Sequence, residues 1–181
     1  MSDSSITKQA LANSMKKLME EKPLSKINIE DIVKQCNLSR KSFYYHFKDK
    51  YNLVNWIFYT EFVSNLQNNP DMGWNLFEDI CIFFYENKTF YRNALEVRGQ
   101  NSFYDYFGEI LSSIIELHFK SILGKYDTSN FYVVFITDAI RISISRWLLE
   151  GAQIPPKEYV ALTKSVVTGL AKYIIEEMDD R

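Results

Sequence analysis

Residues 29–50 read IEDIVKQCNLSRKSFYYHFKDK, and this stretch decides the fold of the N-terminal part of the chain. In its first part apolar residues recur at intervals of three and four, which predicts a short amphipathic helix: Ile29, Ile32, Val33 and Cys36. Asn28 is a good N-cap for that helix. Asn37 follows the helix, and Asn adopts the left-handed backbone conformation of a tight turn more readily than most residues. We therefore expect a helix that ends in a turn at Asn37.

A second short helix is expected after the turn. Ser39 can cap it by accepting a hydrogen bond from one of its first free N–H groups. Phe43 and Phe47 lie four residues apart and should face the core, so the other side chains remain largely outward: Arg40, Lys41, Ser42, Tyr44, Tyr45 and His46. Asp49 can then cap a longer helix that begins at Lys50 and carries Leu53, Trp56, Ile57 and Phe62.

The pattern is helical in the rest of the chain as well. A first helix from about Ser5 to Glu21 has one buried stripe and ends before Pro23: Leu11, Met15, Leu18 and Met19. Further helices are expected at about 72–87, 88–98, 102–124, 129–150 and 156–178. Only six Gly and four Pro interrupt 181 residues, which favours long helices. The expected fold class is all-α.

Composition narrows the class of protein. The polar start of the chain lacks a signal-peptide pattern, and no apolar run approaches the ~18 residues of a membrane span. We expect a soluble, cytoplasmic protein without membrane contact. Cys36 and Cys81 form neither a disulfide framework nor a metal set, so no metal and no cofactor are expected. Residues 1–50 carry a net charge of +4 and residues 51–181 a net charge of −6, which suggests that the N-terminal part meets a polyanion.

Two short helices joined by a tight turn can place the second one in the major groove of double-stranded DNA. Arg40 and Lys41 stand at the N-terminal end of that helix, where side chains usually reach base edges. Five side chains carry hydroxyl, imidazole or ammonium groups that suit phosphate oxygens: Ser39, Ser42, Tyr45, His46 and Lys50. The alternative is the solvated face of an ordinary helical hairpin. Two adjacent tyrosines on such a face, Tyr44 and Tyr45, would expose at least one aromatic ring and lower solubility.

The segment Leu38 to Lys50, LSRKSFYYHFKDK, closely resembles the DNA-binding head of the TetR family of regulators. The resemblance implies an all-helical homodimer of about nine helices per subunit, with a DNA-binding domain at 1–50 and a dimerisation and effector domain at 51–181. It also implies that Arg40, Lys41 and Tyr44 read bases. Two positions depart from the family pattern: Asn37 replaces a usual Gly, and Lys41 replaces a small residue or Pro.

The C-terminal half resembles one subgroup of this family. Three stretches carry the resemblance: NKTFYRNAL at 87–95, GQNSF at 99–103 and the pair Tyr106-Phe107. The subgroup includes regulators of dihydroxyacetone kinase operons, the DhaS-like proteins. In part of it the signal is thought to arrive as a partner protein. A small-molecule effector and a coactivator protein therefore both stay open.

Several side chains of the C-terminal half are candidates for an effector pocket: Tyr85, Arg92, Arg98, Phe103, Phe107, His118 and Arg141. The three arginines lie among apolar residues and suit an anionic effector. The alternative is that the aromatic residues form plain core and that Glu96, Glu109 or Asp138 pairs with the arginines internally.

The last two helices suit a dimer interface because they are apolar on more than one face. The candidate interface residues are Phe135, Ile142, Trp147, Leu162, Val166, Leu170 and Tyr173. Two-fold pairing would set two recognition helices roughly 34–36 Å apart, as a palindromic operator requires. A monomeric core is the alternative. Catalysis finds no support, since the chain has two histidines, no nucleophile motif and no phosphate-binding glycine loop.

Overall fold

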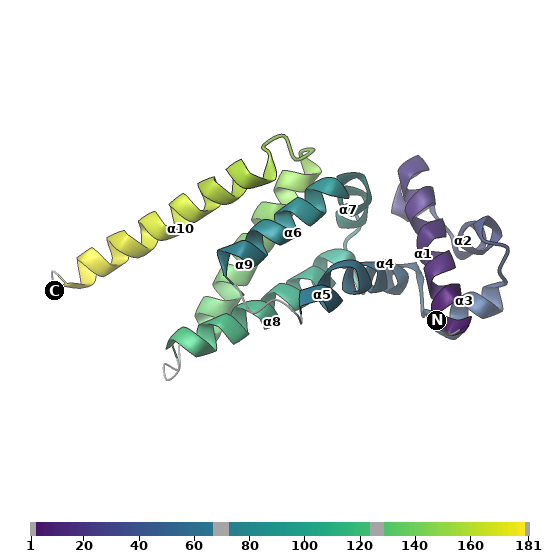
Figure 1. Cartoon of the computed structure of the whole chain (residues 1–181), viewed down its shortest axis with the longest axis horizontal. Helices are drawn as coiled ribbons and strands as arrows, with labels where there is room; N and C mark the ends of the chain where they lie inside the picture. Colours follow the sequence, from purple (N-terminus) through teal and green to yellow (C-terminus); the bar gives the residue numbers. More distant parts are fainter. Residues whose placement is uncertain (1–2, 67–72, 124–128, 180–181) are drawn as a thin grey trace.

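The computed structural model describes residues 3–66, 73–123 and 129–179. Counting the unbroken run from Lys50 to Leu66 as one helix, these residues form nine α-helices and no strand, which confirms the all-α prediction (Figure 1). The elements in chain order are α1 (Asp3–Glu21), a 3-10 turn η1 (Leu24–Lys26), α2 (Ile29–Gln35), α3 (Arg40–His46), α4 (Lys50–Phe58), a π-helical segment η2 (Tyr59–Val63), α5 (Ser64–Leu66), α6 (Trp74–Glu86), α7 (Lys88–Leu95), α8 (Phe103–Leu123), α9 (Ser129–Leu149) and α10 (Pro156–Asp179). Within the described ranges, none of these helices is both long and apolar enough to span a bilayer.

Two helices differ clearly from the sequence prediction. The helix expected to run to residue 98 ends at Leu95, because the segment after it turns sharply: Gly99 has φ +114° and Asn101 has φ +65°. The long helix that begins at Lys50 loosens into the π-helical segment Tyr59–Val63 before it continues.

The N-terminal head consists of α1, α2 and α3. The predicted stripe of α1 is buried, and it packs with the two phenylalanines of the recognition segment and with α2: Leu11, Met15, Leu18, Met19, Ile32, Val33, Phe43 and Phe47. These apolar contacts fix the orientation of α3 relative to α1. The outward residues of α3 are therefore held on a rigid support.

A cluster of aromatic rings fills the centre of the body. Phe58 at the end of α4 is fully buried, and seven other rings have centroids between 5.3 and 6.4 Å from its own: Phe62, Phe83, Phe84, Tyr91, Phe103, Tyr106 and Phe107. Around this cluster α8 packs along α9, and α6 packs against the start of α10. Edge-to-face and stacked pairs of this kind add to the free energy gained from burial.

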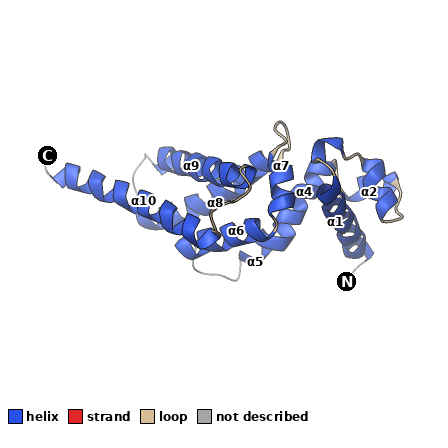
Figure 2. Ribbon diagram, turned by 90° about the horizontal axis from the view of Figure 1, so that it is seen from above, coloured by secondary structure: helices blue, strands red, loops and turns tan. Residues whose placement is uncertain are grey.

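The head lies at one end of the molecule, and α10 extends from the other (Figures 1 and 2). Polar contacts join head and body across the junction. Lys16 of α1 donates to Glu61 at 2.8 Å, and Asn93 of α7 bonds to backbone groups at the end of α1. The head is thus connected to the body through α1 as well as through the covalent continuation into α4.

Candidate nucleic-acid interface

The turn between α2 and α3 has the geometry expected from Asn37. Asn37 has φ +53°, its N–H donates to the Lys34 carbonyl at 3.3 Å, and the Leu38 N–H donates to the Val33 carbonyl at 2.9 Å. These two bonds form a Schellman motif, which satisfies the last carbonyls of α2. The turn is therefore compact, and it directs the chain straight into α3.

Both ends of α2 are fixed. Asn28 accepts from the Asp31 N–H at 2.9 Å while Asp31 accepts from the Asn28 N–H at 3.0 Å, which completes a capping box. Lys22 also donates to Asp31, at 2.8 Å. The hydrogen bond from Lys22, together with that from the Asn28 N–H, holds the pKa of the Asp31 carboxyl below its ordinary value.

Helix α3 buries one face and exposes the other. Phe43 and Phe47 are 0% and 3% exposed, whereas Tyr44 is 51% and Tyr45 82% exposed. Arg40 and Lys41 are exposed at the N-terminal end, with the Arg40 guanidinium 6.0 Å from the centre of the Tyr44 ring. The structure therefore gathers the three predicted base-reading side chains on the outer face of one helix.

The predicted phosphate contacts flank this face. Ser39 caps α3 by accepting from the Ser42 N–H at 3.1 Å, which leaves its hydroxyl hydrogen free to donate outward. Ser42 and His46 are half-buried, and the His46 ring lies against that of Tyr45. Lys48 was not singled out from the sequence, but it is exposed in the turn after α3 and adds a positive charge beside the face.

Lys50 does not share the outward orientation of the other candidates. Its ammonium donates to the carbonyls of Leu24 and Ile27, each at 2.7 Å, and to that of Ser25 at 3.4 Å. Burial lowers the pKa of Lys50, and the negative charge of Asp31 opposes that shift. The three carbonyls occupy the N–H groups of the Lys50 ammonium that would otherwise donate to a phosphate. Lys50 therefore holds the start of α4 against the loop before α2.

Contacts between head and body were not visible in the sequence pattern. Asn101, in the segment between α7 and α8, donates to the Asp49 carboxylate at 3.2 Å, and its carbonyl accepts from the Asn55 amide at 3.3 Å. Asp49 also caps α4 by accepting from the Asn52 N–H at 2.7 Å. The available sequence signal was an Asn two residues after Gly99, which marks a turn without revealing what the turn contacts.

The described residues among those predicted to line an effector pocket lie in separate surroundings. Phe103 and Phe107 are buried in the aromatic cluster, and Tyr85 stacks on Trp147. Arg92 pairs loosely with Glu96 at 3.9 Å. Arg98 and Arg141 come together at the ring of Tyr104. The His118 side chain lies outside the described part of the structure.

Most of the predicted interface residues that can be described are exposed. Phe135 and Ile142 of α9 and Leu162 and Val166 of α10 are 63%, 48%, 51% and 62% exposed. The side chains of Leu170 and Tyr173 lie outside the described residues. Trp147 is 6% exposed within the protomer, stacks on Tyr159 at 4.6 Å and donates to the Ile154 carbonyl at 2.9 Å. Its own protomer therefore covers most of the Trp147 side chain, and its place in a dimer interface stays a prediction.

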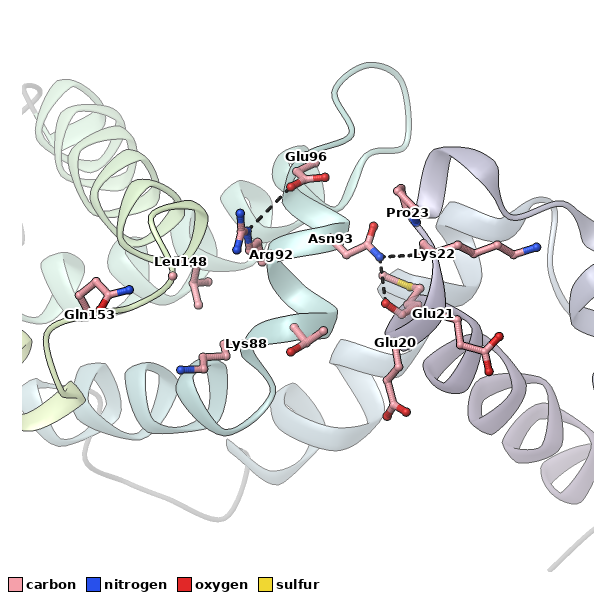
Figure 3. Close-up of a pocket in the computed structure, with 13 residues that line it drawn as sticks. Glu20, Glu21, Lys22, Pro23, Lys88, Arg92, Asn93, Glu96, Leu148 and Gln153 are labelled. Carbon is pink, nitrogen blue, oxygen red and sulfur yellow. Dashed lines mark hydrogen bonds and ion pairs between the residues drawn. The ribbon is translucent and has the colours of Figure 1, made fainter.

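A groove of about 480 Å³ opens between the head and the body (Figure 3). Its walls are the end of α1 and the side of α7, with Gln153 at the far end. Asn93 points across this groove toward the carbonyls of Met19 and Lys22, and accepts from the Leu24 N–H. The groove therefore lies at the junction that sets the position of the head.

Comparison with known families agrees with this architecture. Residues 14–57 match the family described as "Bacterial regulatory proteins, tetR family", and residues 74–169 match "Transcriptional regulator C-terminal region". The first match covers the helix-turn-helix and reaches into α4. The second covers more than half of the chain.

Similar proteins are regulators as well. The chain is 31% identical over 99 residues to the HTH-type dhaKLM operon transcriptional activator DhaS of Lactococcus lactis, a match over 54% of this chain and 53% of that protein. The chain thus matches about half the length of this relative. The structure of a dihydroxyacetone kinase operon activator DhaS superposes with a TM-score of 0.68 at 20% identity, over 93% of this chain and 97% of the other.

Two further solved structures share the fold. A TetR-family transcriptional regulator from Syntrophomonas wolfei has a TM-score of 0.64 at 21% identity, over 92% of this chain and 95% of the other. NalD of Pseudomonas aeruginosa, the secondary repressor of the MexAB-OprM multidrug efflux pump, has a TM-score of 0.59 at 15% identity, over 88% and 92%. With both family matches, this chain belongs to the TetR family of bacterial transcriptional regulators.

Proposed function

We propose that the protein binds a palindromic DNA operator as a homodimer and that its C-terminal domain controls this binding. One observation carries the proposal: α3 exposes Arg40, Lys41 and Tyr44 on a helix that two buried phenylalanines hold in place. A rigidly supported helix with cations at its N-terminal end suits the major groove.

The exposed side chains divide into two groups by chemistry. Arg40, Lys41 and Tyr44 are proposed to read base edges, with Arg40 suited to guanine O6 and N7. Ser39, Ser42, Tyr45 and His46 are proposed to contact phosphates and fix the register of the protein on the duplex. Lys50 is proposed to hold the loop that supports α2, because its ammonium already has three carbonyl acceptors.

The proposed dimer uses the exposed apolar side chains of α9 and α10, including Phe135, Ile142, Leu162 and Val166. Large exposed apolar side chains on two consecutive helices favour burial against another surface. Two-fold pairing through this surface is the arrangement that a palindromic operator requires. The likeness to DhaS supports a role in regulating genes of the dihydroxyacetone kinase type. A cytoplasmic location follows from such a role.

A partner protein is the second candidate for the controlling signal. The aromatic side chains predicted to line an internal pocket, Phe103 and Phe107, are buried against Phe58 and Phe84 instead. Control through an outer surface is therefore favoured over control through the centre of the aromatic cluster. Co-purification of a stoichiometric protein, with no small molecule raising the melting temperature, would support this second candidate.

A gel shift with the DNA that flanks the protein's own gene tests DNA binding. Arg40→Ala should weaken specific binding by about 5- to 150-fold, the worth of one good base contact. Arg92→Ala is the matched control, because Arg92 is an exposed arginine on α7 of the body. Wild-type affinity in the Arg40 variant would contradict the assignment of α3 as the recognition helix.

A further inference from the structure

Two guanidinium groups share the ring of Tyr104 on α8. The Cζ of Arg98 lies 3.5 Å from the ring centre and the Cζ of Arg141 lies 4.4 Å from it, so two positive charges stand within about 8 Å of each other. Arg141 is neutralised by Asp138 at 2.6 Å. It is also wedged against Gly108, where an added Cβ would lie 2.6 Å from its Nη1. Among the described residues no carboxylate is within ion-pair distance of Arg98.

A pocket of about 340 Å³ adjoins this pair. Its charged walls are Arg98, Arg146 and Glu150, and its other walls are Tyr104, Ile142, Leu149 and Ser145. Arg146, like Arg98, has no ion-pair partner within the part of the chain that is described. The two cations and one carboxylate give the lining a net charge of +1. The volume is at the lower end of the range for small-molecule sites.

Ser145 supplies an independent sign of a ligand. Its side chain is 3% exposed, lines the pocket, and has no hydrogen-bond partner for Oγ among the described residues. The Nε of Arg141 is buried beside this region and is likewise unpartnered there. A buried polar atom without a partner destabilises the fold. An acceptor placed in the pocket would relieve that cost at Ser145.

We propose that this pocket binds a small organic molecule with one negative charge, carried by a carboxylate or a phosphate diester. Its anionic oxygens accept from Arg98 and Arg146, and the Ser145 hydroxyl donates to it. Leu149 contacts the short apolar part of the molecule, whereas Ile142 lies at the edge of the pocket that faces the proposed dimer surface. A single negative charge matches the lining, because Glu150 would repel a second one. This assignment rests on the proposed control through the C-terminal domain and names the class of its effector.

The position of Arg98 connects the pocket to the DNA-binding head. Arg98 lies in the short segment between α7 and α8, three residues before Asn101. Asn101 bonds to Asp49, and Asp49 caps α4 immediately after the recognition helix. A ligand that draws Arg98 into the pocket therefore moves a segment that contacts the end of the head. Ligand binding and DNA binding are coupled through this segment.

Binding is tested by calorimetry with two probes, butyrate and dimethyl phosphate, at constant ionic strength. Saturable binding of at least one probe is expected, and the double variant Arg98→Gln, Arg146→Gln should weaken it at least about tenfold. Ser145→Ala should weaken it less. Arg92→Gln serves as the control arginine on the body. A variant with Arg40→Ala and Lys41→Ala removes the cations of the DNA interface and should leave probe binding unchanged.

The proposed site is overturned if neither probe binds saturably, or if the double variant binds as tightly as the wild type. Loss of probe binding in the Arg40, Lys41 variant would place the anion in the head instead. Coupling is tested separately by measuring the DNA dissociation constant with and without saturating probe. Asn101→Gly keeps the positive φ but loses the bond to Asp49, so it should still bind the probe while the effect on DNA binding disappears.

No change of DNA affinity on probe binding in the wild type would overturn the coupling. Failure of the unliganded protein to bind DNA would contradict the proposed function and leave the calorimetric result for the pocket intact. The two failures are therefore distinguishable.

Discussion

The side-chain oxygen of Asn93 accepts a hydrogen bond from the backbone N–H of Leu24 at 2.6 Å, across 69 positions of sequence. The amide nitrogen of Asn93 donates to the carbonyls of Met19 and Lys22, each at 3.0 Å. One side chain on α7 thus satisfies three backbone groups where α1 ends and η1 begins, and Figure 3 draws the two bonds that the Asn93 amide donates. The carbonyl of Leu24 in turn accepts from Lys50, so the same peptide segment is held from both α7 and α4.

Asn93→Ala should lower the free energy of unfolding by about 1–3 kcal/mol, because it leaves partly buried backbone groups without their partners. Urea denaturation followed by circular dichroism measures this change. Gln153→Ala removes an exposed amide from the same groove and should leave stability nearly unchanged. Equal stability of both variants and the wild type would show that water replaces the three bonds at no cost.

Local pattern was sufficient to predict the helix-turn-helix. The residues that form it are close in sequence, and each acts through a short-range rule. Asn28 and Ser39 cap helices, Asn37 takes the left-handed conformation, and Phe43 and Phe47 return to the core. The outward face of α3 follows once the inward face is known. Its base and phosphate contacts stay predictions.

The remaining features depend on contacts between residues far apart in sequence, which periodicity does not encode. Lys50 looks like a phosphate ligand from its place in the motif, yet its ammonium reaches back 23 to 26 residues to η1 and the loop before α2. Phe103 and Phe107, expected around an effector, became core because they pack on Phe58 of α4 and on Phe84 of α6. Trp147 is largely covered within the protomer because α10 begins close enough for Tyr159 to stack on it.

Lys50→Met should lower the free energy of unfolding by about 1–3 kcal/mol, since the carbonyls of Leu24 and Ile27 lose a charged donor. Lys48 is an exposed lysine in the preceding turn, so Lys48→Met should leave the free energy of unfolding nearly unchanged. The salt dependence of DNA binding then shows whether Lys50 supports the loop before α2 or contacts a DNA phosphate. A wild-type slope of log K against log salt is expected for Lys50→Met. A flatter slope with unchanged stability would instead indicate the phosphate contact that the sequence predicts.

Asp31→Asn should lower stability at pH 7 by about 0.5–2 kcal/mol through loss of the capping box and the Lys22 contact. The pKa of Asp31 is lowered in the folded state from an ordinary value of 3.8, so the carboxylate stabilises the fold fully above that value. This contribution is lost as the pH falls below about 4 and through the folded pKa. The stability difference between wild type and variant should therefore narrow in acid, as urea titrations at pH 7, 4 and 3 would measure. Glu30→Gln, an exposed neighbour in the same helix turn, is the control at pH 7 and should lower stability less, because Glu30 takes no part in the capping box.

Phe135→Lys and Leu162→Lys should weaken self-association, because each places a charge on the exposed apolar faces of α9 and α10 proposed to meet in the dimer. Loss of a central apolar contact typically costs 2 kcal/mol or more in association, or roughly 30-fold in the dimer dissociation constant. Sedimentation velocity over a range of concentrations measures the shift. Leu117→Lys is the control, since Leu117 of α8 is 62% exposed but lies outside the proposed interface. All three variants should keep their helical circular dichroism, because the side chains exchanged are already exposed in the protomer. If Leu117→Lys alone produced monomers, the interface would lie on α8, and the two recognition helices would be spaced by a different pairing.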